Sequence, residues 1–323
     1  MRRSRSKNAA RCRAVRLAVQ AAETLDAQTA MDLREDHVFR RMRTMISSHR
    51  LALAVTALLT LPSVASAAPP HDFSIYAIRM GGDAAQAKPY VDRFARHLET
   101  VTGWPTASSN GAFFTSRKEA VAALDAQKPG WAVVEPSLYF ELRKSHKAVA
   151  VAQVVSSDLN TAQLHVIVKD PAIKSLSDLS GKRVWTQLAD AGKYLSNVVF
   201  DGKGAAETRF QLKQVGVVTK GIRAVIRGEA DATLVDPDQL VEAKKMEGGA
   251  DLRSVYTSEA LPGLLVVAFP QLAAADQKKL STALIGMCAT ANGGPVCKEM
   301  HIQKFEAVNS AQLSTTEKRY EKP

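Results

Sequence analysis

The chain has 323 residues, of which 46% are hydrophobic, and it carries a formal net charge of +11. This length and apolar content suit one large or two medium globular domains, each with its own core. Most of the positive excess lies before residue 68, because residues 68–323 hold 31 Lys+Arg against 27 Asp+Glu, a net charge of +4. Because no Lys/Arg block is interleaved with aromatic residues, this composition argues against a nucleic-acid-binding protein.

An apolar segment near the N-terminus has the organisation of a secretory signal. Residues 51–61 (LALAVTALLTL) are uncharged, Arg43 and Arg50 precede them, and Ala65-Ser66-Ala67 follows. A basic region, an apolar region and a small-residue cleavage site in this order are typical of a signal peptide. The apolar run is too short to span a bilayer, which takes roughly 20 residues. We therefore expect residues 45–67 to be a signal peptide.

The residues before Met45 are polar and arginine-rich, unlike the start of an ordinary signal peptide. We interpret residues 1–44 as a mis-assigned start or a disordered leader. The alternative is a genuine extension of the twin-arginine type, since Arg40-Arg41 is present. No cysteine follows the cleavage site to receive a lipid, so the sequence predicts a free periplasmic protein.

The cysteines agree with export. Cys12 lies in the expected leader, which leaves Cys288 and Cys297, nine residues apart. In an oxidising compartment such a pair indicates one local disulfide. A zinc site is the alternative, but His301 is the only histidine nearby, and two cysteines with one histidine make an incomplete ligand set. We expect a disulfide, no metal and no cofactor.

Strands and helices alternate along the remaining chain. Residues 73–78 alternate apolar and polar side chains, whereas Tyr90, Phe94, Leu98 and Val101 have helical spacing and precede a stop at residues 102–105. Ser116 and Glu119 indicate a capping box at the start of the next helix. Further strands are expected at 131–134, 148–155, 164–168, 182–185, 232–235 and 264–269, and further helices at 136–144, 192–199, 220–227 and 273–290. This alternation favours a parallel α/β sheet.

The sequence offers no catalytic constellation. It lacks a G-x-S-x-G nucleophile elbow, an H-E-x-x-H motif and a G-x-x-x-x-G-K-S/T phosphate loop. The histidines after the expected cleavage site lack a partner at metal-ligand spacing; they are His71, His97, His146, His165 and His301. We therefore expect a binding protein rather than an enzyme.

Candidate ligand-binding residues follow the predicted strands, because ligands of open α/β sheets bind outside the carboxyl ends of the strands. Ser109 and Asn110 are also ordinary turn residues, and Thr219 and Asp236 are also good helix N-caps, so these alternatives stay open. The candidates are Arg79, Ser108, Ser109, Asn110, Glu135, Ser137, Tyr139, Thr186, Thr219, Lys220 and Asp236.

Four segments resemble the periplasmic phosphonate/phosphate-type substrate-binding proteins of ABC transporters, which have the type 2 periplasmic-binding fold. Residues 173–185 (IKSLSDLSGKRVW) are similar to the family's "I-x-S-L-x-D-L-x-G-K-x-V" segment. Residues 223–236 resemble its "A-V-x-x-G-x-x-D-A-x-x-V-D" segment. Residues 131–139 (WAVVEPSLY) and 258–269 (SEALPGLLVVAF) resemble a first-lobe strand and a returning crossover.

The resemblance implies two α/β lobes joined by two crossover strands that act as a hinge. Residues 68–163 and 258–323 would form lobe I, and residues 164–257 lobe II. By position, the cleft between the lobes would be lined by Tyr139, Thr186, Thr219, Lys220 and Asp236. The implied function is capture of a small polar solute by a monomer that delivers it to an inner-membrane ABC permease or a sensor.

The turn after the G-K-x-V strand departs from the family pattern. A Ser/Thr-rich turn that opens a helix suits an anion, but here residues 186–192 read TQLADAG. Asp190 places a negative charge there, and Glu135 replaces a glycine of the first lobe, whereas Lys193 and Lys220 would offset them. The ligand is therefore phosphonate- or phosphate-like, or it carries an amine or is neutral if the acids dominate.

The resemblance also suggests one function of another class. Dehydratases of menaquinone synthesis are enzymes on the same fold. Those enzymes are cytosolic, so the expected signal peptide argues against this alternative.

The leader gives a first testable prediction. N-terminal sequencing of the exported protein is expected to start at or close to Ala68, after Ala65-Ser66-Ala67. A mature chain that begins at Met1 or Met45 would contradict it.

Overall fold

The computed structural model describes residues 70–77, 83–156, 163–203 and 206–322, and these belong to one unit of the chain, Val64–Pro323. The expected leader and Arg79 lie outside the described residues. Within the described ranges, no helix is both long and apolar enough to cross a membrane.

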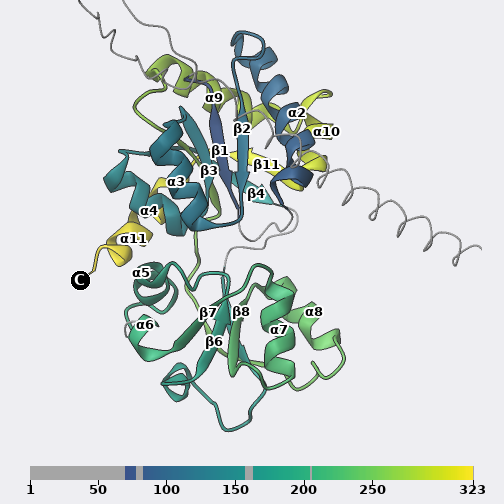
Figure 1. The fold of residues 1–323 in the computed structure, drawn as a ribbon, viewed down its shortest axis with the longest axis vertical. Helices are drawn as coiled ribbons and strands as arrows, with labels where there is room; N and C mark the ends of the chain where they lie inside the picture. Colours follow the sequence, from purple (N-terminus) through teal and green to yellow (C-terminus); the bar gives the residue numbers. More distant parts are fainter. Residues whose placement is uncertain (1–69, 78–82, 157–162, 204–205, 323) are drawn as a thin grey trace, which may run out of the picture. The chain divides into compact units, whose positions relative to one another are not determined.

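Lobe I, as the structure has it, is built on a six-stranded mixed sheet in the order β11-β4-β10-β3-β1-β2 (Figure 1). β1 pairs in parallel with β2 and β3, whereas β10 is antiparallel to β3 and β4, and β11 is antiparallel to β4. The strands are β1 (Phe73–Tyr76), β2 (Gly111–Phe114), β3 (Trp131–Val134), β4 (Val149–Ser156), β10 (Leu264–Ala268) and β11 (Ile302–Glu306).

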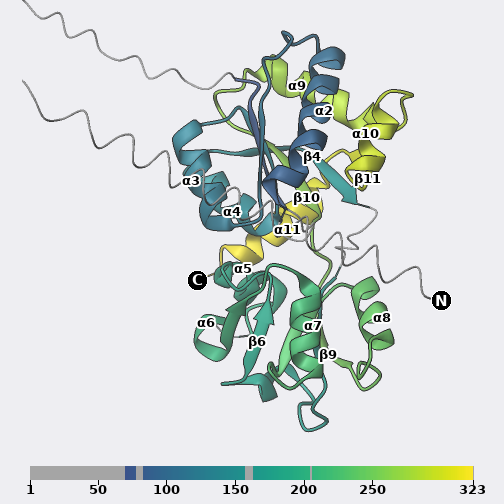
Figure 2. The same cartoon turned by 45° about the vertical axis from the view of Figure 1, so that its right-hand side comes forward.

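Helices cover both faces of this sheet: α3 and α4 lie on one side, and α2 and α10 on the other (Figures 1 and 2). Leu138 of α4 packs into one core, and Phe94 of α2 packs into the other with Leu280 of α9. The helices are α2 (Ala84–Thr102), α3 (Arg117–Gln127), α4 (Pro136–Ser145), α9 (Ala274–Met287), α10 (Gly293–Glu299) and α11 (Ser310–Tyr320).

Lobe II is built on a five-stranded mixed sheet in the order β7-β6-β8-β5-β9. Its strands are β5 (His165–Val168), β6 (Arg183–Thr186), β7 (Gln211–Gln214), β8 (Ala232–Val235) and β9 (Arg253–Thr257). Its helices are the 3₁₀ helix η2 (Leu176–Leu179), α5 (Gly192–Tyr194), the π-helix η3 (Leu195–Val199), α6 (Ala206–Arg209), α7 (Val218–Ile226) and α8 (Pro237–Lys245). The chain passes between the two sheets twice, from β4 to β5 and from β9 to β10. This is the two-lobed α/β fold with two crossovers that the sequence predicts.

An aromatic cluster fixes the centre of the lobe I core. The rings of Phe73 and Trp131 stack with centroids 4.3 Å apart, and Phe94 meets Phe73 edge to face at 5.8 Å. All three side chains are at most 2% exposed. Truncating such a buried ring to alanine typically costs about 3–5 kcal/mol, so this cluster joins α2 firmly to β1 and β3.

The structure corrects two expectations about the elements. The sheets are mixed rather than parallel, because a strand that enters from the other lobe, such as β10 or β5, runs in the opposite direction to its neighbours. The helical stripe is shifted, since Tyr90 and Val101 are 42% and 48% exposed while Val91 and Leu98 are buried. The expected stop is confirmed at Gly103, whose φ of 71° ends α2.

The structure joins Cys288 and Cys297 in the predicted disulfide, with the two Cα atoms 5.5 Å apart. The bond links the end of α9 to α10 and closes a loop of nine residues. Cys297 is only 2% exposed and packs in the core of lobe I. The disulfide therefore restrains the part of lobe I that leads into β11.

Replacing both cysteines by serine is expected to lower the free energy of unfolding by about 2–3 kcal/mol, because the unfolded chain loses a short closed loop. Urea unfolding of the oxidised protein and the double variant, both without reductant, measures the difference. Equal unfolding midpoints, or labelling of both thiols in the exported wild type, would contradict the prediction.

Candidate functional site

Polar side chains gather at the carboxyl edge of the lobe I sheet. Tyr76 ends β1, Glu135 follows β3, and Ser137 lies in the first turn of α4. All three are buried, and Glu135 is only 1% exposed. Glu135 occupies the N-cap position of α4 but its side chain does not cap the helix. These groups face the edge at which the fold places ligands.

Arg117 places a positive charge at the carboxyl edge of the lobe I sheet. It is the first residue of α3, directly after the Ser116 cap, and its side chain is 12% exposed. Its Nη2 donates to the Ser137 carbonyl oxygen at 3.2 Å and to Glu141 Oε2 at 2.5 Å. The guanidinium also hydrogen-bonds the Tyr76 side chain. We refer to Tyr76, Arg117, Glu135, Glu141 and Asp190 as the Arg117 cluster.

Asp190 brings a carboxylate of lobe II to the same cluster. Asp190 is exposed overall, but partial desolvation of its carboxyl raises its pKa, the Arg117 guanidinium opposes that rise, and the Glu141 carboxylate adds to it. Burial is also the main reason why the pKa of Tyr76 is strongly raised, and Asp190 and Glu135 raise it further. The Arg117 guanidinium thus interacts with the carboxyl groups of Glu141 and Asp190, and Glu135 lies close to the Tyr76 hydroxyl.

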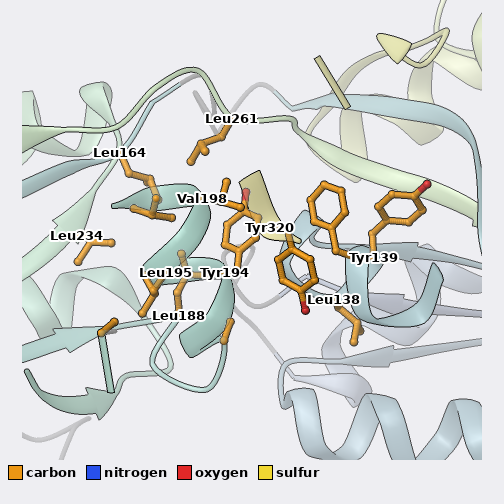
Figure 3. Close-up of a cluster of buried hydrophobic side chains, with 14 of the residues drawn as sticks. Leu138, Tyr139, Leu164, Leu188, Tyr194, Leu195, Val198, Leu234, Leu261 and Tyr320 are labelled. Atoms are coloured by element: carbon orange, nitrogen blue, oxygen red, sulfur yellow. The ribbon is translucent and has the colours of Figure 1, made fainter. Parts of the chain in front are cut away.

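A cavity of about 10 Å³ lies beside the cluster, where the two lobes meet. Lobe I contributes Glu135, Pro136 and Ser137, and Figure 3 shows Leu164, Leu188, Tyr194 and Leu261 on the other side. A space of this size barely holds one water molecule. A solute therefore enters only if the lobes separate, which matches the hinge that the two crossovers provide.

The turn after β6 is held by its own side chains. Thr186 Oγ1 accepts from the Leu188 N–H at 3.2 Å, and Gln187 Nε2 donates to the Gly216 carbonyl at 3.1 Å. Gln214 holds the turn from β7, because its Nε2 donates to the Gln187 carbonyl and its Oε1 accepts from the Asp190 N–H. The helix that follows, α5, runs directly into the π-helix η3, so the helical segment spans Gly192–Val199. The turn thus offers an anion one threonine hydroxyl, whose O–H can still donate because the bond from Leu188 uses only its oxygen.

Some predicted residues lie outside the Arg117 cluster. Tyr139 is 4% exposed and hydrogen-bonds the Ala150 backbone of β4, and Figure 3 shows its ring pointing away from Tyr194. Thr219 and Lys220 are exposed on the first turn of α7. Thr219 is not the cap of that helix, because Val217 holds the N-cap position.

Asp236 serves as a helix cap, as one alternative predicted. Its carboxylate accepts from the Gln239 N–H at 2.8 Å, and Gln239 Oε1 accepts in return from the Asp236 N–H. Asp236 is 1% exposed and raises the pKa of His165, against a larger lowering by burial. Lys193 is exposed, with its Nζ 4.9 Å from the centre of the Tyr320 ring.

Ser108, Ser109 and Asn110 were expected after the second strand, but the structure places them before it. β2 begins at Gly111, so they lie at the amino ends of the strands, opposite the Arg117 cluster. There Asn110 donates to Asp72 Oδ1 and the Ser109 N–H donates to Glu99 Oε1 at 2.8 Å. Their expected position after a strand is wrong, because β2 follows these residues instead of preceding them.

Arg117, Tyr76 and Glu141 are the candidate residues that the sequence prediction missed. Arg117 follows a helix cap and has the pattern of a solvated helix start, and Glu141 has that of a solvated helix face. Correct placement of β2 would have identified Arg117 as the residue just beyond the carboxyl end of that strand. Across the described part of the chain, no group of three or more His, Cys, Asp or Glu side chains is arranged to hold a metal ion.

The raised pKa of Asp190 makes a prediction for stability. The folded carboxyl holds its proton more tightly than the unfolded one, so ionisation at neutral pH opposes folding, and this cost is relieved as the pH falls through the raised pKa. Because Asp190 is exposed and water screens its charge, Asp190→Asn is expected to raise the Tm at pH 7.5 by at most about 1–2 °C. The gain should shrink as the pH approaches 4. A Tm of Asp190→Asn below that of the wild type at pH 7.5 would contradict this prediction. Asp238→Asn, on the exposed start of α8, is the control.

Comparisons with known proteins agree with this architecture. The family model described as "ABC transporter, phosphonate, periplasmic substrate-binding protein" matches residues 82–313. A search of curated proteins gave no match. XAC2383 from Xanthomonas citri, solved bound to ATP, is 14% identical, with a TM-score of 0.61 over 77% of this chain and 96% of that chain.

Two further solved structures share the fold. A binding protein component of an ABC phosphonate transporter from Pseudomonas aeruginosa is 16% identical, with a TM-score of 0.55 over 77% of this chain and 86% of that one. PhnD1 from Prochlorococcus marinus, in complex with methylphosphonate, is 13% identical, with a TM-score of 0.54 over 77% of this chain and 97% of that chain. Because the family model covers most of its length, the chain belongs to the phosphonate family of periplasmic substrate-binding proteins of ABC transporters.

Proposed function

We propose that this protein captures a small polar solute between its two lobes in the periplasm and delivers it to an inner-membrane ABC permease. The family match, the two crossovers and the signal-like leader support this role. A membrane sensor is the alternative partner. The same match favours a solute-binding protein rather than a dehydratase-like enzyme, because the members of this family are components of transporters.

The charges of the Arg117 cluster support a solute that carries an ammonium group. Glu141 and Asp190 both interact with the Arg117 guanidinium, Glu135 lies close to the Tyr76 hydroxyl, and partial loss of hydration raises the pKa of Asp190, although that residue is exposed. A cation close to these carboxyl groups would lower that cost, whereas a dianion would increase it. This excess of acid over base is the observation that carries the proposal.

Arg117 gives the same solute a place for one anionic group. Its planar fork suits two oxygens of a carboxylate or a phosphonate, and its present anionic partner, Glu141, is on a half-exposed helix face. We therefore favour a zwitterion with an amine and one acidic group. A simple alkylphosphonate held by Arg117 is the second candidate, which the family match favours.

A thermal-shift screen tests the class of solute. Aminoalkylphosphonates, amino acids, simple amines, alkylphosphonates and phosphate are added separately to the wild type. A zwitterionic ligand at a hundredfold excess over its Kd is expected to stabilise the protein by about 2.7 kcal/mol, a Tm rise of several degrees. Asp190→Asn and Arg117→Gln should each reduce that rise, whereas Lys220→Ala, on the exposed start of α7, should leave it unchanged.

Two results would contradict the proposal. A shift produced only by phosphate and alkylphosphonates would replace the zwitterion with the second candidate. A ligand whose effect survives both Asp190→Asn and Arg117→Gln would move the binding site away from the Arg117 cluster.

A further inference from the structure

The C-terminal helix α11 is fixed to lobe I. The Asn309 N–H donates to Gln153 Oε1 of β4 at 3.2 Å, and the Asn309 side chain caps the helix by accepting from the Gln312 N–H. Thr316 is fully buried. Ion pairs tie the outer face of α11 to α4, and they are Arg143–Glu317 and Lys144–Glu321.

The end of this helix also contacts lobe II. Asn197 Nδ2 of η3 donates to the carbonyl oxygens of Tyr320 at 3.2 Å and Lys322 at 2.8 Å. The Tyr320 ring stacks on Phe140 of α4 at 5.2 Å, and Phe140 in turn lies 6.3 Å from the Tyr194 ring of lobe II. Figure 3 shows Tyr320 between the side chains of the two lobes, and Figures 1 and 2 both place the C-terminus beside α5.

The receiving segment is held within lobe II. The Phe200 N–H donates to the Leu195 carbonyl at 2.8 Å, a π-type bond that closes η3. Ser196 Oγ accepts from the Ala206 N–H at 2.7 Å, and the Tyr256 hydroxyl donates to the Val199 carbonyl at 3.0 Å. π-turns are rare and occur frequently at functional sites. Movement of lobe II therefore carries Asn197 with it.

One residue opposes this contact. Arg319, next to Tyr320, has its Nε and Nη1 atoms buried with no hydrogen-bond partner in the described residues. Its guanidinium influences the Tyr256 phenol of β9, which places the charge close to lobe II. Buried donors without partners are costly, and separation of the lobes would return these to water. Asn197 and Tyr320 thus stabilise the contact between the lobes, and the unpaired donors of Arg319 destabilise it.

We propose that residues 320–322 act as a latch: by holding η3 of lobe II to α11 of lobe I, they set the fraction of solute-free molecules that are open. The consequence for transport rests on the proposed function, since an open molecule admits solute and a latched one excludes it. The latch itself is a property of the solute-free chain, so it can be tested without any ligand.

The test measures the distance between the lobes in solute-free protein. Spin labels are placed at Lys118→Cys in α3 and Asp238→Cys in α8, both exposed, in a Cys12→Ser background. Double electron–electron resonance then gives the distribution of distances between the two spin labels. Asn197→Ala is expected to raise the ratio of long to short distances roughly tenfold, as the loss of one to two hydrogen bonds implies. Deletion of residues 320–323 should have an equal or larger effect.

Three further variants complete the design. Arg319→Met keeps the aliphatic packing but removes the unpaired donors, so it should lower the ratio. Lys193→Met removes the cation over the Tyr320 ring without changing α11, and it should raise the ratio of long to short distances. This variant replaces the deletion in the test if the deletion does not fold. Lys318→Ala, an exposed position on the same helix, is the matched control and should leave the ratio unchanged.

The latch is overturned if Asn197→Ala and the deletion both give the wild-type distribution of distances. If the deletion does not fold, Lys193→Met takes its place in this comparison. Opening by Arg319→Met as large as that of Asn197→Ala would also overturn the latch. Neither result depends on the solute screen, so the latch and the zwitterion proposal fail separately.

Discussion

The constraint on which the site depends is the burial of charge where the carboxyl edges of two sheets meet. Both lobes place strand ends there, and strand ends leave polar groups to be satisfied. Lobe I meets this need with Arg117, which donates to Ser137 and Glu141. Lobe II adds the Asp190 carboxyl, whose raised pKa means that its ionised form is disfavoured in this position. The charges of the Arg117 cluster therefore bear on whether the two lobes stay in contact.

Apolar contact supplies the rest of the interface. Leu188 and Tyr194 of lobe II, with Leu261 beside them, face Pro136 of lobe I, and the cavity that remains is about 10 Å³. Separation of the lobes would expose these side chains to water, at roughly 25 cal/mol for each Å² of apolar surface. A solute must offset this loss with its own contacts. The fold thus makes affinity a difference between two competing sets of contacts for the same surfaces.

The architecture could be predicted from the sequence because most strands are buried runs between clear helix signals. β3, β8 and β10 are buried at every position, and each was expected within a residue or two of its bounds. β7 was missed because its residues, Gln211–Gln214, are polar and largely exposed, which leaves no period to detect.

The site was predicted less well, for a different reason. Glu135 and Ser137 follow a strand that was placed correctly, and both line the cavity. Arg117 follows β2, which comes after residues 108–110 instead of before them, so the error moved the candidate residues to the wrong edge of the sheet. Asp190 was identified from its charge, but its neighbours come from lobe I, and no local pattern encodes a contact over that separation. Predictions at strand ends are thus only as accurate as the strand bounds.

The turn after β6 explains why family membership alone does not fix the ligand. An anion at a helix start is held by several free N–H groups and by the dipole of a long helix. Here the Leu188 N–H donates to Thr186 and the Asp190 N–H donates to Gln214, and α5 runs on into the π-helix η3. These two hydrogen bonds therefore leave two fewer N–H groups of this turn for an anion. The same turn carries the Asp190 carboxyl, whose charge interacts with Arg117 and Glu141 of lobe I, so charge as well as N–H geometry separates this turn from the family pattern.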